Sequence, residues 1–255
     1  MVKLLELIVR RADWTHAEFV KYHSTNHLEV VDRVPEFRNR VRQYIQTPLF
    51  VDTAELASIK GLPISSTADA IIEVWWDSAD DIRRAFEEPR YLEIVRPDEF
   101  VFADVAGSWG LMLRDAVIME RSGFAGQIKL FFFIKKENGL SRPEFLGRWR
   151  DVRESRLMQT QAFRNFVGRL VQNEIDAESD ESVPGSREFD LVLELWFDSV
   201  REVAQFAAST DVIDAITGTG ADYSDRDQTL IYLGQERPES AQWLRRSQNT
   251  NPGRD

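Results

Sequence analysis

Two of the three histidines in this 255-residue chain, His23 and His27, are four residues apart in a segment whose apolar residues recur at helical spacing. We expect one helix over residues 16–34, with both histidines on the same apolar face as Val30 and Val34. That face must pack on a sheet, which would bury the two imidazoles one turn apart. Burial lowers the pKa of histidine and favours its neutral form, which can take a proton from carbon or oxygen. The pair therefore predicts acid–base chemistry in an apolar pocket.

A histidine pair at this spacing can also bind a metal ion if a third ligand is near. Asp98, in an expected turn after Pro97, or Glu73 would be that ligand, but the chain contains no HExxH or similar pattern. We therefore predict no metal site and keep metal binding as an alternative. Tyr44 ends an expected strand, and its hydroxyl would lie near the two histidines.

The chain contains two copies of one pattern. Residues 17–46 align without a gap on residues 143–172, with seven of thirty positions identical. Chance at ordinary composition would give roughly two identities. A second block, residues 73–78, matches residues 194–199 in the same order along the chain. The repeats predict two homologous modules.

Only the first copy keeps the histidines. Trp149 stands at the position of His23, and Arg153 stands at the position of His27. We therefore predict one working site, in the first copy. Arg153 would either extend its charged end to water or pair with a substrate carboxylate.

Each copy has the apolar pattern of strand, helix, strand, strand, helix, strand. Thr15 and Ser141 are expected N-caps, each followed three residues later by a glutamate, and the second helices start at Ser78 and Ser199. The expected strands are 2–10, 37–46, 69–77 and 108–114 in the first copy, and 127–135, 163–172, 189–197 and 228–233 in the second.

A four-stranded antiparallel sheet with two helices on one face leaves its other face bare. Two such modules in one chain would bury both bare faces against each other. We therefore predict an α+β fold in which two tandem ferredoxin-like (βαββαβ) modules pack their antiparallel sheets into one α+β barrel. The expected parts are a first module at 1–120, a second at 121–236, a polar tail at 237–255, and long loops at 47–68 and 173–188. The second loop is acidic and would be a lid or a solubilising insertion.

The composition excludes several classes of protein. The chain has 43 acidic and 32 basic residues, a net charge of −11 and no cysteine. Such a balance disfavours a nucleic-acid binder, and the lack of cysteine excludes a thiol nucleophile or a Cys-ligated metal. No apolar run is long enough for a membrane span, and the first residues lack a signal-peptide pattern. We expect a cytoplasmic protein that is a monomer, as a pseudo-dimer, or a homodimer.

Several residues of the first copy form a pattern of their own: Phe19, Tyr22 and His27, the Val34-Pro35-Glu36-Phe37 turn, Tyr44-Ile45-Gln46, Glu73-Val74-Trp75-Trp76-Asp77-Ser78 and Pro97-Asp98-Glu99. In this pattern the chain resembles the EthD family of the dimeric α+β barrel superfamily. The resemblance covers nearly all of residues 1–114 and returns weakly over 127–235. It implies a pocket between the sheet and its own helices. His27 matches the family histidine and Tyr44 the family tyrosine, whereas the second copy has Arg153 and Leu170 there.

Relatives in this superfamily include lactone isomerases, polyketide cyclases, anthrone decarboxylases and cofactor-free monooxygenases. The resemblance implies a cofactor-independent lyase, dehydratase or isomerase that acts by His-mediated proton transfer on a hydrophobic cyclic metabolite (aromatic, polyketide or lactone). His27 would move the proton, while Tyr44 and His23 would polarise a carbonyl or enolate oxygen. The expected substrate contacts are Phe19, Asn26, Trp75, Trp76 and Asp98.

Two alternatives stay open. Tryptophans fill protein cores, but several together can also line a pocket for a flat ligand. The protein would then be a non-catalytic binding or accessory module for an aromatic metabolite. The other alternative is an oxidoreductase that uses the histidine pair to ligate a metal or haem.

Overall fold

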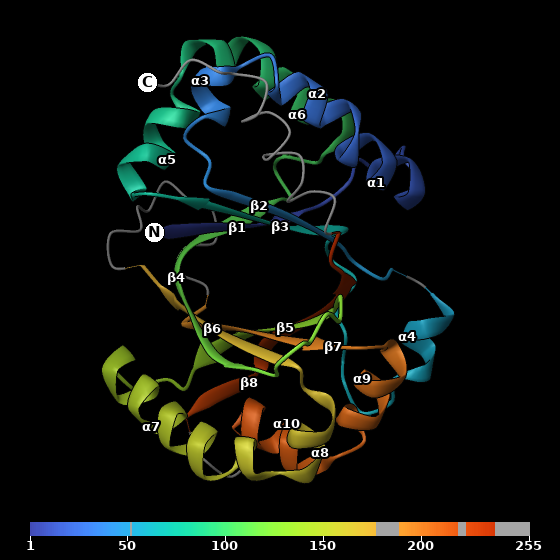
Figure 1. Cartoon of the computed structure of the whole chain (residues 1–255), viewed down its shortest axis with the longest axis vertical. Helices are drawn as coiled ribbons and strands as arrows, with labels where there is room; N and C mark the ends of the chain where they lie inside the picture. Colours follow the sequence, from blue (N-terminus) through green and yellow to red (C-terminus); the bar gives the residue numbers. More distant parts are fainter. Residues whose placement is uncertain (52, 177–188, 219–222, 238–255) are drawn as a thin grey trace.

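In the computed structural model, which describes residues 1–51, 53–176, 189–218 and 223–237, eight antiparallel strands form one sheet. The strands are β1 (Val2–Ile8), β2 (Gln43–Pro48), β3 (Ala70–Trp76), β4 (Trp109–Glu120), β5 (Ile128–Lys136), β6 (Arg169–Ile175), β7 (Leu191–Phe197) and β8 (Ser224–Gln235). Their order across the sheet is β2-β3-β1-β4-β6-β7-β5-β8, so the pairing of β4 with β6 joins the two copies. Figure 1 shows the sheet curled so that its two halves face each other.

The two edge strands, β2 and β8, meet where the curl closes. The backbone N–H of Phe50 donates to the carbonyl of Leu233 at 2.8 Å, and that of Arg237 donates to the carbonyl of Gln46 at 2.8 Å. These bonds close the sheet into a barrel. The predicted α+β barrel of two tandem ferredoxin-like modules is therefore confirmed.

Helices cover the outer faces of both halves (Figure 1). The first half carries α1 (His16–Ser24), α2 (Asn26–Val31), α3 (Pro35–Arg38), α5 (Ala79–Phe86), the π-helical turn η1 (Tyr91–Val95) and α6 (Arg96–Phe102). The second half carries α7 (Arg142–Ser155), the 3₁₀ turn η2 (Leu157–Gln159), α8 (Gln161–Phe166), α9 (Val200–Ala207) and α10 (Thr210–Thr217), and α4 (Ala54–Ser58) lies in the connection from β2 to β3. Within the described ranges, every helix is too short or too polar to cross a bilayer.

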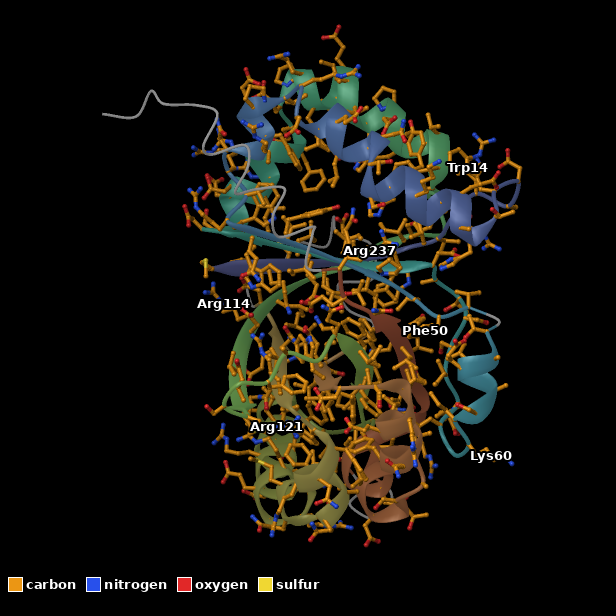
Figure 2. All side chains as sticks on the ribbon, turned by 45° about the vertical axis from the view of Figure 1, so that its right-hand side comes forward. Trp14, Phe50, Lys60, Arg114, Arg121 and Arg237 are labelled. Carbon is orange, nitrogen blue, oxygen red and sulfur yellow. The ribbon has the colours of Figure 1, made fainter. Side chains whose placement is uncertain are left out.

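Side chains alternate between the two faces of each strand, and this alternation creates three apolar layers. Leu4 and Ile72 face the helices of the first half, whereas Leu130 faces those of the second half. Leu5 and Phe131 belong to the third layer, between the two halves. Figure 2 shows side chains filling the space inside the barrel.

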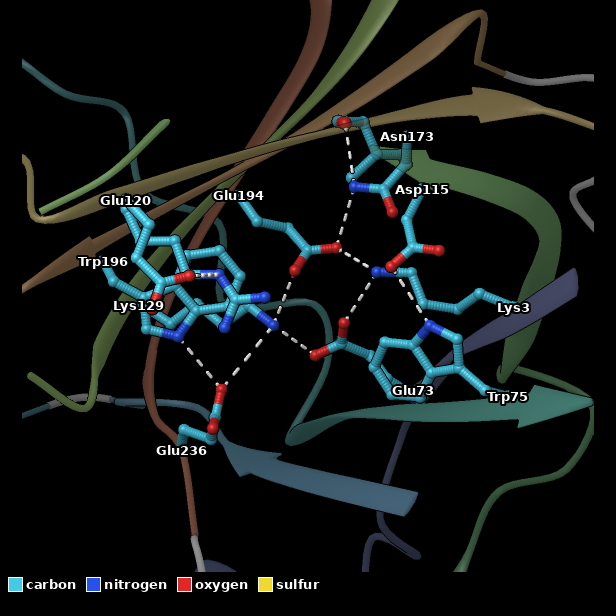
Figure 3. A network of polar contacts seen from close by, with 12 residues as sticks. Lys3, Glu73, Trp75, Asp115, Glu120, Lys129, Asn173, Glu194, Trp196 and Glu236 are labelled. Carbon is cyan, nitrogen blue, oxygen red and sulfur yellow. Dashed lines mark hydrogen bonds and ion pairs between the residues drawn. The ribbon is translucent and has the colours of Figure 1, made fainter. Parts of the chain in front are cut away.

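Four buried charges cross the centre of the barrel (Figure 3). The Lys3 ammonium is 2.9 Å from a Glu73 oxygen and 2.5 Å from a Glu194 oxygen. The Lys129 ammonium is 2.7 Å from the other Glu194 oxygen and also pairs with Glu73. Burial on its own would lower the pKa of Lys3, but the two carboxylates raise it above its ordinary value. The lysine therefore stays charged, and the four charges balance.

This charged quartet follows the repeat in the sequence. Lys3 and Lys129 are equivalent in the two copies, and Glu73 and Glu194 are equivalent in the Trp-Asp-Ser blocks. Each lysine bridges one glutamate from its own copy and one from the other. The quartet therefore links the inner faces of the two halves. It also removes Glu73 as the metal ligand considered above, because its carboxylate is held by two lysines.

The predicted second strands begin several residues too early. The expected strand at 37–46 starts with the end of α3, and the one at 163–172 starts inside α8. Pro35 begins α3 at the first helical position, and the hydroxyl of Thr160 accepts from the backbone N–H of Phe163 at 3.2 Å to cap α8. These local helix signals override the apolar pattern.

The remaining differences concern the long connections. Asp98 and Glu99 lie in α6 and not in a turn, because Pro97 stands in the first turn of that helix, where proline is tolerated. β4 is longer than predicted because its second part pairs with β6 of the other copy. Most of the predicted acidic loop, 177–188, and the tail after residue 237 lie outside the described residues.

Candidate active site

A cavity of about 770 Å³ lies between the first-half sheet and its own helices. This volume lies within the range of small-molecule sites, roughly 300–1,000 Å³. The wall is mostly apolar, with residues such as Leu4, Val31, Ile72, Trp76, Phe86, Phe102 and Met112. The charged and other titratable side chains that line it are Glu6, His23, His27, Tyr44, Asp80, Arg83, Glu87, Tyr91, Arg96 and Glu99, and Ser108 adds a hydroxyl.

His27 is held by an ionised carboxylate behind it. Its Nδ1 is 2.8 Å from an oxygen of Asp98, whose other oxygen accepts from the Tyr22 hydroxyl at 2.6 Å. Burial on its own raises the pKa of Asp98, but the bonds from His27 and Tyr22 bring it below its ordinary value. Because an ionised carboxylate can only accept, this contact favours the tautomer of His27 with a proton on Nδ1. Within the described residues, Nε2 has no hydrogen-bond partner, and His27 lines the cavity.

A break in the helix places the two histidines. The expected single helix over 16–34 is wrong, because Thr25 leaves the helical conformation with φ −127° and ψ −77° between α1 and α2. The hydroxyl of Ser24 donates to the Val20 carbonyl at 2.8 Å, and that of Thr25 donates to the Lys21 carbonyl at 2.7 Å. Such bonds compete with helix continuation. The imidazoles still meet across the break, with ring centroids 5.4 Å apart.

His23 is the more deeply buried histidine of the pair. Its ring stacks on Phe19 at a centroid distance of 5.6 Å, and its Nδ1 is 3.3 Å from the Gln46 amide nitrogen. Burial, with a smaller effect from His27, lowers the pKa of His23 well below its ordinary value. His23 is therefore neutral and cannot add a positive charge beside His27.

Tyr44 lines the cavity from β2. Its hydroxyl oxygen accepts from the Gln46 amide at 2.8 Å. Burial raises the pKa of Tyr44 above its ordinary value. The phenol therefore keeps its proton at neutral pH.

Glu6 is a cavity residue that the sequence reasoning missed. It lies on β1 on the same face as Leu4 and Ile8, and Gly110, its partner on β4, leaves room for it; a Cβ at Gly110 would meet the Glu6 side chain at 3.4 Å. In the part of the chain that the structure describes, its carboxyl makes no hydrogen bond or ion pair. Burial, with a smaller effect from Glu99, raises the pKa of Glu6 to about 7. The repeat in the sequence could have pointed to Glu6, because the equivalent residue of the second copy is the apolar Phe132.

This raised pKa predicts a pH effect on stability. Between pH 4.5, the ordinary value, and about 7, folded Glu6 keeps a proton that the unfolded chain has lost. The free energy of unfolding therefore falls as pH rises through this window, by about 2–3 kcal/mol once water in the cavity is allowed for. Glu6→Gln cannot titrate, so we expect its stability relative to wild type to increase by this amount from pH 4.5 to 7. Urea unfolding at a series of pH values measures the difference, and a constant difference would contradict the assignment.

Comparison with known protein families shows to which family the chain belongs. The profile of the EthD domain matches residues 11–106 and 137–227. The chain belongs to the EthD family. Its two matched stretches are the two copies seen in the sequence, so the protein is a tandem EthD protein. No protein with a curated description matches its sequence significantly.

Solved structures with low identity share the fold of this EthD protein. One is described as an anthrone oxidase-like protein, 9% identical over 92% of each chain, with a TM-score of 0.59. Another is a mutant chlorite dismutase from Candidatus Nitrospira defluvii, 10% identical over 96% of this chain and 94% of that chain, with a TM-score of 0.51. At these identities the likeness shows the fold alone.

Only some of the expected substrate contacts of this EthD protein line the cavity. Trp76 lines the cavity, and Phe19 lies beneath the His23 ring. Asp98 lies behind His27 and not on the cavity wall. Trp75 points to the other face of the sheet, where its indole N–H donates to Asp115, because neighbouring strand residues face opposite sides. Asn26 is exposed on α2, outside the cavity wall.

The second EthD copy fills the equivalent space with larger or apolar side chains. Trp149 and Arg153 stand where the first copy has its histidines, and both donate to the side-chain oxygen of Gln172, at 2.9 and 2.6 Å. Phe132 stands where the first copy has Glu6, and Ile231 faces it as Gly110 faces Glu6. These four residues are all buried. Arg153 is therefore tied to its own module and does not extend into water.

The third histidine has a structural role in this EthD protein. His16 Nδ1 is 3.0 Å from an oxygen of Asp69, at the start of α1. In the second copy, Arg142 pairs with Asp190 at the start of α7. The two contacts are equivalent, which indicates that both anchor a helix start to the sheet. Among the described residues, no three His, Cys, Asp or Glu side chains are arranged to hold a metal ion.

Proposed function

We propose that this EthD protein is a cofactor-independent enzyme that moves a proton on a hydrophobic cyclic compound. One observation carries the proposal: His27 lines an apolar cavity, its Nδ1 contacts Asp98, and its Nε2 has no hydrogen-bond partner among the described residues. A carboxylate behind an imidazole holds the tautomer and stabilises the imidazolium that forms when Nε2 accepts a proton. The arrangement suits a general base.

The neighbouring groups support this assignment. Tyr44 keeps its proton because burial raises its pKa, and it lines the same cavity. Its hydroxyl, with neutral His23 beside it, would polarise a carbonyl or enolate oxygen of the substrate. Proton transfer by a positioned group contributes roughly 10²–10⁴-fold to a rate. Elimination through a carbanion and isomerisation through an enol both begin with such a step.

The wall of the cavity favours an uncharged, flat substrate. Its aromatic members include Phe37, Trp76 and Phe102. The two arginines of the wall are already paired, Arg96 with Glu99 at 2.6 Å and Arg83 with Glu87 at 3.4 Å, so neither is free to bind a substrate anion. Aromatic, polyketide and lactone compounds have the matching shape and polarity.

Anthrone is a suitable first probe, because its C10 protons are acidic and lie across the central ring from its carbonyl. The experiment measures the exchange of these protons in D₂O by NMR, under nitrogen to prevent oxidation. We expect the protein to accelerate exchange and anthrone to quench the fluorescence of the tryptophans that line the cavity, Trp76 and Trp109. Binding without acceleration would favour the binding-module alternative.

Haem ligation by His27 would use the same Nε2 atom, because its Nδ1 contacts Asp98. A haemin titration of wild type and His27→Ala therefore separates this alternative from proton transfer. We expect no Soret change that depends on His27. A Soret shift that His27→Ala abolishes would contradict the proposed function.

A further inference from the structure

We propose that Glu6 is a second catalytic residue of the cavity, which gives a proton to a substrate oxygen while His27 takes one from a substrate carbon. The inference rests on the proposed function and adds its missing acid. The first observation is the position of Glu6 relative to His27. Glu6 lies on the sheet wall of the cavity, and His27 lies on the helix wall opposite.

The carboxyl of Glu6 has no structural task among the described residues. It makes no hydrogen bond or ion pair there, although it lies on a strand between apolar neighbours of the same face. Glu6 is partly buried and lines the cavity, so its carboxyl lies without a protein partner in a mostly apolar wall. A polar group placed in this way is costly to a fold, and such groups concentrate at functional sites. Gly110, its partner on β4, places no side chain beside it.

The second copy supplies an internal comparison. There the catalytic candidates are absent, and Phe132 and Ile231 replace Glu6 and Gly110 with core side chains. By contrast, the buried lysines and glutamates at the centre of the barrel are kept in both copies. Glu6 is therefore lost from the second copy together with the histidines, whereas the structural lysines and glutamates are kept.

Charged and titratable groups line the cavity around Glu6, including Asp80 and Arg83 of α5. Arg96 and Glu99 face it from α6, Tyr91 from η1 and Tyr44 from β2, while His23 and His27 share the cavity from the helices. Burial and Glu99 favour its neutral form, and Arg96 opposes them. Glu6 therefore retains its proton up to about pH 7 and can donate it.

The step on anthrone balances as a tautomerisation. The C10–H bond breaks and its proton passes to Nε2 of His27. The electron pair moves through the ring to the carbonyl oxygen, which takes the proton of Glu6. The products are the enol, an imidazolium and the Glu6 carboxylate, and the reverse step returns a solvent deuteron to C10.

The test compares C10 exchange by wild type, Glu6→Gln and Glu29→Gln. Glu29 is exposed on the same helix as His27 and lies outside the cavity wall, so its variant controls for the lost charge. We expect Glu6→Gln to lose about 10²-fold of the exchange rate. We also expect the decline of the wild-type rate above pH 7 to be absent from Glu6→Gln. Equal rates and pH profiles for both variants would overturn the proposal.

A second measurement separates this inference from the proposed function. Anthraquinone has the carbonyl but no acidic C–H, so its binding does not depend on proton removal. We expect the infrared carbonyl band of bound anthraquinone to shift to lower frequency with wild type at pH 6 and not with Glu6→Leu. If wild type fails to exchange anthrone but shows this shift, the proposed function fails and Glu6 remains the oxygen-binding acid. If the shift is absent from wild type, Glu6 does not touch the substrate oxygen and the inference fails.

Discussion

His27→Ala is expected to lower the acceleration of anthrone exchange by about 10²–10⁴-fold. The variant removes the imidazole of a residue that lines the cavity and leaves the apolar wall in place. Binding of anthrone, followed by fluorescence quenching, should therefore persist. Because the lost side chain leaves a gap at the base position, added imidazole should restore part of the rate.

Arg153→Ala is the matched control, because Arg153 is the equivalent of His27 in the second copy. It removes a bond to Gln172, to which Trp149 still donates, so we expect some loss of stability. The exchange rate per folded molecule should remain that of wild type. Equal loss of rate in both variants would contradict a single site.

Lys129→Met is expected to destabilise the protein by about 3–5 kcal/mol, because it leaves two buried carboxylates with one lysine. Lys129 pairs with both Glu73 and Glu194, and its side chain is 1% exposed. Urea unfolding by circular dichroism measures the loss. The exposed pair Arg83–Glu87 gives the control: Arg83→Met should change stability by less than about 1 kcal/mol.

A double variant tests whether the four charges act as one unit. Lys3→Met with Glu73→Leu removes one charge of each sign and leaves Lys129 paired with Glu194 at 2.7 Å. We expect the double variant to lose less stability than the sum of the two single variants, because charge balance is restored. Additive losses would contradict the quartet as an interacting unit.

Most of the fold could be predicted from the repeat in the sequence. Each copy repeats a capping box, at Thr15 and at Ser141, and both are present in the structure. The bare sheet face of each module required a partner, and the second copy supplies it. The break at Thr25 could not be foreseen, because threonine hydroxyls bond to the preceding turn only in some contexts.

The candidate site was less accessible to sequence reasoning than the fold. Helical spacing alone placed His23 and His27 on one face, and they do meet in the structure. The role of Asp98 behind His27 depends on how α6 packs against α2, which no local pattern encodes. Glu6 required the register of β1 against Gly110. The partners of Lys3 and Glu73 likewise depend on the facing of two sheets, although both residues recur in the second copy.

The tautomer of His27 tests the central claim most directly, and ¹⁵N NMR of histidine-labelled protein reports it. At about pH 8, where histidine is ordinarily neutral, a hydrogen on Nδ1 and a bare Nε2 are the expected state. Assignment by the loss of the signal in His27→Gln identifies the residue, and Asp98→Asn should reduce the population of this tautomer. A hydrogen on Nε2 in the wild-type protein would contradict the account, because the nitrogen that faces the cavity could not then accept a proton.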